Sequence, residues 1–303
     1  MRKLSGIAGA VGVLAVAVPM LAAGASEPTK ITIGAQVGLI GATTDSIWAP
    51  DQVLSRLVRI DAGTGKIKAQ VKTGLRPFSV VSSTGSVWLT NLNSGTVQRI
   101  DPRTNRVLAT IKVGNGPYGL ASGAGGIWVS NSQDGTVSRI STSKNRVVKR
   151  FAAGKEPNGI VYAYGSLWVG DYGGSRLLRI NPTTGQITRR WTIAKADWVT
   201  ASPGTLWVSS ERGTIVRIDP VTGTVTARIK VGSNPLATAW IDGELWVPNI
   251  DSDTVSIIDP AANVVRETRK VGDGPAAIAL AGGSVWVGDS NDGDVWRLTR
   301  RVR

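Results

Sequence analysis

The sequence predicts an all-β fold made of repeated four-stranded sheets, and three observations support this prediction. Seven tryptophans recur 40, 40, 40, 39, 39 and 40 residues apart, at Trp48, Trp88, Trp128, Trp168, Trp207, Trp246 and Trp286. Each lies in a unit with four short runs rich in Val, Ile, Thr and Trp, which tend to alternate as strands do. No segment after residue 25 shows sustained helical periodicity. Seven such units predict a seven-bladed β-propeller of four-stranded antiparallel blades.

The third unit illustrates how one blade is expected to form. Its four strands, called A to D here, are expected near residues 118–122, 126–131, 136–141 and 146–152. Gly123 to Gly126 supply backbone that can adopt positive φ between A and B, and Asp134-Gly135 is a hairpin signal between B and C. In the unit before it, Asp101-Pro102 fits the first two positions of a type I turn between C and D.

The two ends of the repeat region complement each other. The seventh unit has A, B and C runs but no D run before the sequence stops. Residues 29–34 precede the first A run and resemble the D-run endings Ile111-Lys-Val-Gly114 and Ile229-Lys-Val-Gly232. We therefore predict that this N-terminal segment forms the outer strand of the last blade and closes the ring, which removes an unpaired junction.

The first 25 residues differ from the rest in composition. Arg2 and Lys3 precede an apolar run that reaches about Leu21, and Ala23-Gly24-Ala25 matches a signal-peptidase site. We predict a signal peptide at 1–25, a propeller domain at 26–303, and a secreted, periplasmic or cell-envelope location. Cleavage would leave no membrane span, and retention of the segment as a membrane anchor is the alternative.

The chain is basic, with 35 Lys and Arg residues against 21 Asp and Glu and a formal charge of +14. Arginine recurs at one position of the C run, at Arg59, Arg99, Arg139, Arg179, Arg217 and Arg297. Strand alternation turns these side chains outward, so we expect a solvated basic rim. An anionic cell-envelope polymer is a candidate partner for this rim. The sequence lacks the alternation of aromatic and basic residues that would favour nucleic acid as a partner.

The residues that follow the tryptophans resemble a known repeat. Trp128-Val-Ser-Asn131 with Gly135-Thr-Val-Ser-Arg-Ile140, and Trp246-Val-Pro-Asn249 with Thr254-Val-Ser-Ile-Ile-Asp259, are similar to the YVTN-type β-propeller repeat, with Trp in place of Tyr. The resemblance covers essentially residues 29–300 and implies the propeller fold. It implies no particular activity, because propellers carry many functions.

The residue types restrict the available chemistry. The chain has no Cys and no His, which excludes Ser-His-Asp and Cys-His nucleophiles and argues against zinc or copper sites. Resemblance to the streptogramin B lyases, which are seven-bladed propellers, implies a catalytic His with Glu and magnesium, and that mechanism cannot be carried over. Asp289 to Asp294 resembles a calcium loop, but its Gly is fifth rather than sixth, so we predict an ordinary hairpin. We predict no metal and no cofactor.

The connections from D to A and the B–C turns meet on one face of a propeller, around the channel mouth. Five of these crossings follow a Gly-x-x-Pro pattern, whereas in the fifth unit Ala194 replaces Gly and Asp197 replaces Pro. On this alignment the A–B and B–C turns of the fifth unit are each one residue shorter. A site is most worth seeking where the repeat is broken.

We expect a ligand site at the channel mouth, formed by Arg76, Tyr118, Asn158, Tyr172, Lys195, Asp197, Trp198, Glu211 and Arg212. The preferred function is a non-enzymatic binding or scaffold module for a protein, glycan or small molecule. One alternative is a lyase or hydrolase that uses Glu211, Asp197 and Lys195, because carboxyl groups with shifted pKa values act as general acids or bases. Another is a basic adhesin for anionic polymers.

Overall fold

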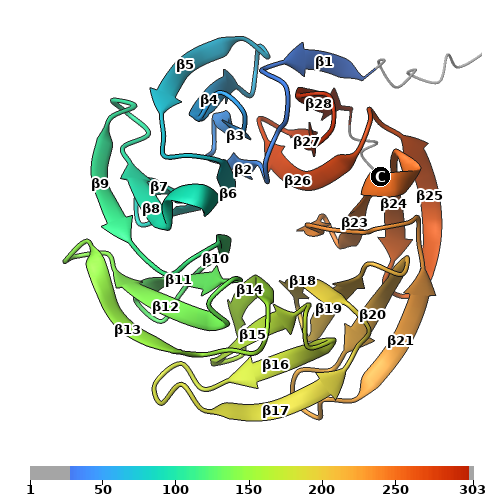
Figure 1. The fold of residues 1–303 in the computed structure, drawn as a ribbon. Coiled ribbons are helices and arrows are strands. Elements are labelled where there is room, and N and C mark those ends of the chain that lie inside the picture. The colour runs from blue at the N-terminus through green and yellow to red at the C-terminus, as the bar shows by residue number, and fades with distance from the viewer. Residues whose placement is uncertain (1–27, 300–303) are drawn as a thin grey trace, which may run out of the picture.

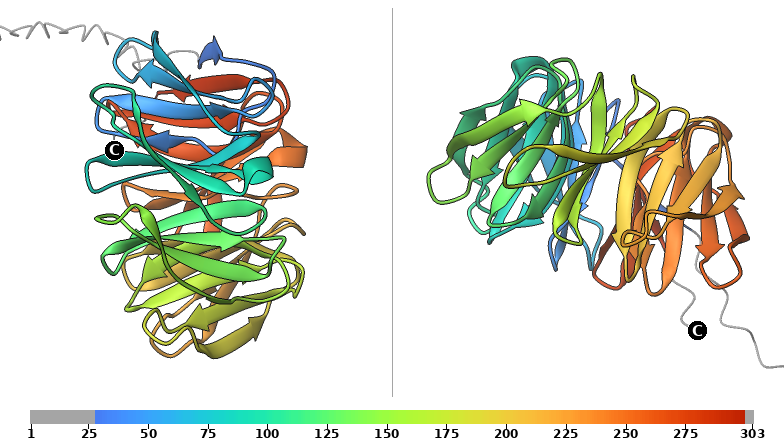
Figure 2. Two further views of the ribbon diagram at one scale, coloured as in Figure 1. Left: turned by 60° about the vertical axis from the view of Figure 1, so that its left-hand side comes forward. Right: turned by 90° about the horizontal axis from the view of Figure 1, so that it is seen from below.

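The computed structural model describes residues 28–299, which form seven four-stranded antiparallel sheets in a ring (Figure 1). This confirms the seven-bladed β-propeller. Figure 2 shows the ring from the side as a thick disc. In this part of the chain the helical segments are two 3-10 turns, η1 (Leu92–Ser94) and η2 (Ile250–Ser252), and no helix is long and apolar enough to cross a membrane. The predicted signal peptide at 1–25 lies outside the described residues.

The strands of each blade run from the axis to the rim, and the blades are numbered one to seven by their innermost strands. The innermost strands are β2 (Gly41–Ala42), β6 (Pro77–Ser83), β10 (Pro117–Gly123), β14 (Pro157–Ala163), β18 (Ala196–Ser202), β22 (Ala239–Ile241) and β26 (Pro275–Ala281). The second strands, which carry the repeated tryptophan, are β3 (Ser46–Asp51), β7 (Ser86–Asn91), β11 (Gly126–Asn131), β15 (Ser166–Asp171), β19 (Thr205–Ser210), β23 (Glu244–Asn249) and β27 (Ser284–Asp289).

The outer half of each blade consists of a third and a fourth strand. The third strands are β4 (Arg56–Asp61), β8 (Thr96–Ile100), β12 (Thr136–Ser141), β16 (Arg176–Ile180), β20 (Thr214–Ile218), β24 (Thr254–Asp259) and β28 (Asp294–Leu298). The outermost strands are β5 (Ile67–Lys72), β9 (Val107–Lys112), β13 (Arg146–Ala152), β17 (Ile187–Thr192), β21 (Val225–Lys230), β25 (Val264–Lys270) and β1 (Thr29–Thr32).

The ring is closed by its N-terminal strand, as predicted. Strand β1 pairs with β28 in blade seven, from Thr29 opposite Arg297 to Thr32 opposite Asp294. Side chains reinforce the pairing, because Lys30 Nζ lies 2.9 Å from Asp294 Oδ2 and Thr32 Oγ1 donates to Asp294 Oδ1 at 2.5 Å. The first and last described strands therefore share one sheet.

The repeated tryptophans form the packing between blades. Six of the seven have no exposed surface, and Trp246 is 4% exposed. Trp128, for example, packs with Leu167 and Val169 of the next blade, while its Nε1 donates to Gly123 O at 3.0 Å. A large aromatic ring fills the wedge that opens between two sheets as they radiate from the axis.

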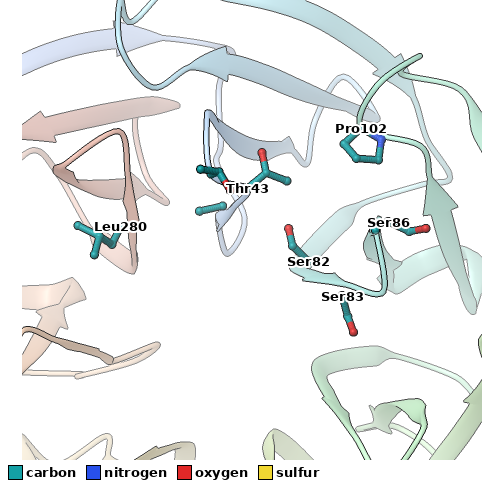
Figure 3. A pocket seen from close by; sticks show the side chains of 9 residues that line it. Thr43, Ser82, Ser83, Ser86, Pro102 and Leu280 are labelled. Atoms are coloured by element: carbon teal, nitrogen blue, oxygen red, sulfur yellow. The ribbon is translucent and has the colours of Figure 1, made fainter.

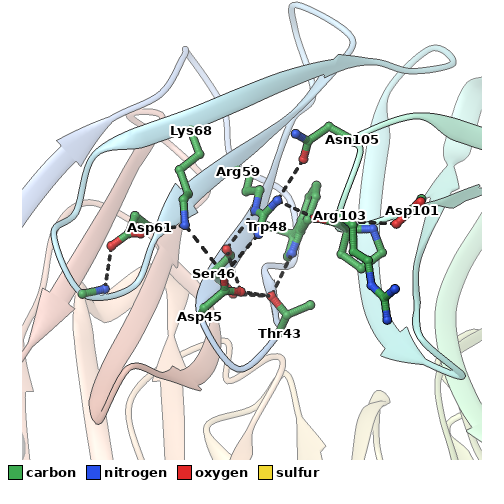
Figure 4. Close-up of polar contacts among 12 residues, drawn as sticks. Thr43, Asp45, Ser46, Trp48, Arg59, Asp61, Lys68, Asp101, Arg103 and Asn105 are labelled. Carbon is green, nitrogen blue, oxygen red and sulfur yellow. Dashed lines mark hydrogen bonds and ion pairs between the residues drawn. The ribbon is translucent and has the colours of Figure 1, made fainter.

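The arginines of the third strands are part of this packing. Each guanidinium lies over the tryptophan of its own blade, at 5.1 to 5.6 Å from the ring centroid. Arg59 also donates through Nη1 to Pro102 O and Asn105 Oδ1 of the next blade, at 2.5 and 3.1 Å (Figure 4). The expectation of a solvated rim was wrong for these six arginines, because both faces of each blade pack against neighbouring sheets.

The polar residue three positions after each tryptophan ties two loops together. Asn131 Oδ1 accepts a hydrogen bond from Gly114 N at 3.0 Å, and its Nδ2 donates to Thr136 Oγ1 at 3.1 Å. A Cβ on Gly114 would come within 2.6 Å of Asn131 Cγ. The Gly at the start of each crossing is therefore required by the Asn or Asp beside it.

Blade five satisfies the same steric requirement with a different pair. Ser210 stands where other blades have Asn or Asp, and Ala194 stands where most have Gly. Ser210 Oγ donates to Ala194 O at 2.6 Å. The smaller side chain at 210 leaves room for the methyl group at 194. This departure from the repeat is thus explained by packing.

Candidate functional site

Strand register corrects the alignment used for blade five. Ala196 pairs with Ser210, just as Pro117 pairs with Asn131 and Pro157 with Asp171. Ala196, and not Asp197, therefore occupies the proline position. Its A–B hairpin has the usual length, since Ser202 opposes Thr205 as Gly123 opposes Gly126. The predicted shortening of the B–C turn is confirmed, since Ser210 opposes Thr214 where Asn131 opposes Thr136. The predicted shortening of the A–B turn is wrong, because the other missing residue lies in the D–A crossing.

The corrected register identifies one position per blade that directly follows the proline position. The seven residues there, called the inner ring from here on, are Gly38, Phe78, Tyr118, Asn158, Asp197, Leu236 and Ala276. All belong to the segments nearest the axis (Figure 1). Four members are apolar or lack a side chain. Polar groups occur only in blades three to five, so the ring has one polar sector.

Asn158 and Asp197 form the centre of this sector. Asn158 Nδ2 donates to Asp197 Oδ1 at 3.1 Å, and the two residues are 5% and 7% exposed. Burial raises the pKa of Asp197 to about 7, with Glu156 and Glu211 contributing in the same direction and the hydrogen bond from Asn158 opposing the rise. Asn158 Oδ1 is buried and has no hydrogen-bond partner. The pair therefore has unused hydrogen-bonding capacity inside the ring.

A second polar group, formed by Tyr172, Glu211 and Lys195, lies near this pair. Tyr172 Oη donates to Glu211 Oε2 at 2.7 Å, and Lys195 Nζ lies 4.1 Å from the centroid of the Tyr172 ring. Burial and the contact with Glu211 raise the pKa of Tyr172 above its usual value. The crossing and the turn are joined by their backbones, because Glu211 N donates to Lys195 O and Tyr172 N donates to Glu156 O.

The structure places the remaining predicted residues differently. Tyr118 is partly buried, its ring lies 4.5 Å from that of Phe78, and burial followed by the charge of Asp197 raises its pKa. Trp198 is partly buried and packs against the apolar cluster that contains Phe78, with its indole over Gly159. Arg76 is exposed and binds Gln52 at 3.1 Å, and Arg212 is exposed.

Two residues of this region were absent from the predicted set. Glu156 acts electrostatically on Asp197, Tyr118 and Tyr172, and Phe78 contributes an aromatic face to the inner ring. Both could have been found from their positions in the crossings, because each is equivalent to a residue of the predicted set. Glu156 in blade four is equivalent to Lys195 in blade five, and Phe78 in blade two is equivalent to Tyr118 in blade three.

The proposed calcium-like loop is a hairpin between β27 and β28. Asp294 is engaged by Lys30 and Thr32 of the closing strand. Burial raises the pKa of Asp289 to about 7. Within residues 28–299, no group of three or more Asp or Glu side chains is arranged to hold a metal ion.

Two surface cavities lie away from the inner ring. One, of about 430 Å³, is lined on the opposite face by A–B turn residues including Thr43, Ser82, Ser83 and Leu280, and by Pro102 (Figure 3). The other, of about 420 Å³, lies between blades two and three and is lined by η1, Lys112 and Gln133. Neither contains a member of the predicted site.

Comparisons with known proteins identify the fold. No family model matches the sequence, and no curated protein is significantly similar to it. Among solved structures, a chain of the Kuenenia stuttgartiensis hydrazine synthase has a TM-score of 0.78 at 15% identity, over 88% of this chain and 96% of that one. A chain of the mitotic checkpoint complex has a TM-score of 0.79 at 14% identity, over 99% of both chains. The computationally designed Ika8 protein has a TM-score of 0.69 at 12% identity, over 89% of this chain and 98% of that one. At these identities the likeness extends to the seven-bladed β-propeller fold alone.

Proposed function

We propose that this chain is an exported, non-enzymatic β-propeller that binds a partner at the channel-mouth face. The observation that carries the proposal is the buried Asn158–Asp197 pair in the inner ring. Ring geometry does not require polar groups there, because Phe78, Leu236 and Ala276 occupy the same position in other blades. A buried carboxyl group with a raised pKa is destabilising, and such groups concentrate at functional sites.

The proposal includes the repeat type and the cellular location. Asn91, Asn131 and Asn249 each donate to the Thr five residues later, which gives the final Asn of the YVTN-like motif a structural role. The signal-like composition of residues 1–25 supports export. A protein, glycan or small molecule of the cell envelope is the proposed class of partner. The exposed basic side chains of the outermost strands, such as Arg150, Arg190 and Lys270, are a secondary surface for an anionic polymer.

A capture experiment with envelope fractions tests this function. Immobilised wild-type protein should retain an identifiable molecule that Asp197→Asn and Glu211→Gln variants retain at least about 10-fold less well, because the Asp197 carboxyl group belongs to the pair and Glu211 acts electrostatically on it. The Asp242→Asn variant is the matched control, since Asp242 is an exposed carboxylate in the A–B turn of blade six, on the opposite face. Equal capture by all four proteins would contradict binding at the channel mouth.

The raised pKa of Asp197 favours a second candidate, a lyase or hydrolase without His or Cys. A carboxyl group that titrates near neutral pH can accept or donate a proton in a reaction. Mass spectrometry of the captured molecule distinguishes the two functions. An enzyme would return it chemically altered with wild-type protein and unaltered with Asp197→Asn, whereas a binding module would return it intact from both.

A further inference from the structure

The unpaired acceptor on Asn158 points to a missing hydrogen-bond donor. In a buried amide, an oxygen without a partner is destabilising. Asn91 Oδ1 and Asn249 Oδ1 are also unpaired, but both stand at the repeated position after the tryptophan, whereas Asn158 occupies a position that is apolar in other blades. Asn158 is 5% exposed, and its Nδ2 already serves Asp197. Rotating the Asn158 amide by half a turn would not remove the unpaired atom, because Nδ2 would then lack an acceptor. Asn158 Oδ1 would also face Asp197 Oδ1, which is unfavourable while Asp197 is ionised. A ligand that donates a proton to Oδ1 satisfies the pair.

The charges around the Asn158–Asp197 pair indicate the charge of that ligand. The charged groups that act on the Asp197 carboxyl are Glu156 and Glu211, both acidic. Of the nearby cations, Lys195 lies over the Tyr172 ring, and Arg76 binds Gln52 through Nε and acts electrostatically on Tyr118 rather than on Asp197. In a chain with a formal charge of +14, the surroundings of the Asp197 carboxyl group are thus acidic. Such surroundings attract cations and disfavour anions.

The apolar part of the inner ring supplies a surface for carbon atoms. Phe78 and Tyr118 pack at 4.5 Å, and Leu236, Ala276 and Trp198 belong to the same cluster. Tyr118 and Trp198 are partly exposed, and Tyr118 is near enough to Asp197 for the Asp197 charge to raise its pKa. Aromatic faces also attract cations.

We infer that the inner ring binds a small organic cation, a protonated amine on an aromatic or aliphatic body, whose ammonium group donates to Asn158 Oδ1 and to the Asp197 carboxyl. This inference rests on the proposed binding function and specifies its ligand class. The ammonium group donates a hydrogen bond to the unpaired oxygen and is attracted by the acidic side chains. A neutral alcohol can donate the hydrogen bond but is not attracted by the charges, and a carboxylate does neither.

Three probes of similar size test the ligand class. Calorimetric titration at pH 8 and low salt is carried out with phenethylamine, 2-phenylethanol and 3-phenylpropanoate. The amine should bind at least about 10-fold more tightly than the alcohol or the carboxylate. Equal affinity for amine and alcohol, or no binding of the amine, would overturn the inference.

Variants link the binding to the pair. Asp197→Asn, which preserves shape, should weaken amine binding at least about 10-fold, and Asn158→Leu should do the same. Asp242→Asn should bind as wild type does. Melting curves establish that each variant is folded before titration. Unchanged affinity in folded Asp197→Asn would place the amine elsewhere and refute the assignment.

The pH dependence gives an independent readout. The amine stays protonated between pH 6 and 8, whereas the ionised fraction of a carboxyl group with a pKa of about 7 rises about 10-fold. Affinity should therefore rise about 10-fold over this range in wild type and stay flat in Asp197→Asn. Glu156, Glu211, Tyr118, Tyr172, Lys195 and Arg76 also face this region, but they remain in the variant and cancel in the comparison.

The result also separates this inference from the proposed function. If envelope capture depends on Asp197 and Glu211 while the amine does not bind, the ligand class is wrong and the binding module stands. If capture is equal in all variants and the amine does not bind, both fail.

Discussion

At the scale of single residues, Asp197 is a group whose ionisation opposes folding. Its pKa is about 7 in the folded protein and near 4 in an unfolded chain, so the folded state holds its proton more tightly. Stability is therefore lost as the pH rises from about 4 to about 7, because ionisation then favours the unfolded state. The group lowers stability at neutral pH, which is why its retention needs a functional reason.

Asp197→Asn should consequently stabilise the protein, and only at higher pH. We expect little difference from wild type at pH 4 and a gain of about 1–4 kcal/mol in the free energy of unfolding at pH 8. Denaturant titrations of both proteins from pH 4 to pH 8 measure it. Asp289 also titrates near pH 7 but is common to both proteins, so it cancels. A difference that does not change with pH would contradict the burial of this carboxyl group.

Ala194 and Ser210 should behave as a coupled pair. Ser210→Asn alone should lower the free energy of unfolding by about 1–3 kcal/mol, because the larger side chain meets the methyl group of Ala194. The double variant Ala194→Gly/Ser210→Asn recreates the pair formed by Gly232 and Asn249 in blade six. There, a Cβ atom on Gly232 would lie only 2.7 Å from Asn249 Cβ. It should recover most of the loss. Additive losses in a double-mutant cycle would show that the two positions are independent.

At the scale of elements, four of the stacked arginines, Arg59, Arg99, Arg217 and Arg297, link their blade to the next one. Arg99 stacks on Trp88 at 5.2 Å and donates through Nη1 to Thr142 O and Asn145 Oδ1 of the next blade, at 2.7 and 2.9 Å. Arg99→Met should lower the free energy of unfolding by about 2–3 kcal/mol, and Arg99→Lys should restore little because Lys lacks the planar fork. Arg103→Met is the control, since Arg103 is exposed. Equal effects of the Arg99 and Arg103 changes in denaturant titrations would refute the link.

Strand β1 should be indispensable to the ring. Deleting residues 29–32 removes the outer strand of blade seven and leaves Asp294 without Lys30 and Thr32. The exposed edge of β28 should lower the melting temperature by about 10 °C or more. A deletion of the same length at the other end of the sequence, residues 300–303, controls for chain shortening in general. An unchanged melting temperature in the first deletion would mean that β1 contributes little to closure.

The strands could be predicted because the same pattern of apolar runs and turns repeats seven times. The inner-ring positions could not be aligned correctly between blades, because blade five combines two changes. Loss of one residue from its crossing together with Pro→Ala at 196 resembles, in sequence alone, a shortened A–B hairpin with Asp197 at the proline position. Only strand pairing separates the two. The role of the arginines was missed for another reason. Alternation tells which face of a strand a side chain occupies, but in a propeller that face packs against another blade.

At the scale of the whole molecule, the residues that stabilise the fold differ from those assigned to binding. The ring resembles propellers in hydrazine synthase, in the mitotic checkpoint complex and in a designed protein, all at 15% identity or less. The features that repeat around the ring, namely the buried tryptophans, the stacked arginines and the capping Asn or Asp residues, are accounted for by packing. The polar sector of the inner ring does not repeat, and it is the part of the ring that packing does not explain. The central claim is that this sector is the binding site.

The most direct test is a crystal structure of the protein with the molecule captured from the cell envelope. The account predicts that the molecule lies at the channel mouth, with a donor group within hydrogen-bonding distance of Asn158 Oδ1 and close to the Asp197 carboxyl. Binding instead in the hydroxyl-lined cavity formed by Thr43, Ser82 and Ser83 on the opposite face would contradict it.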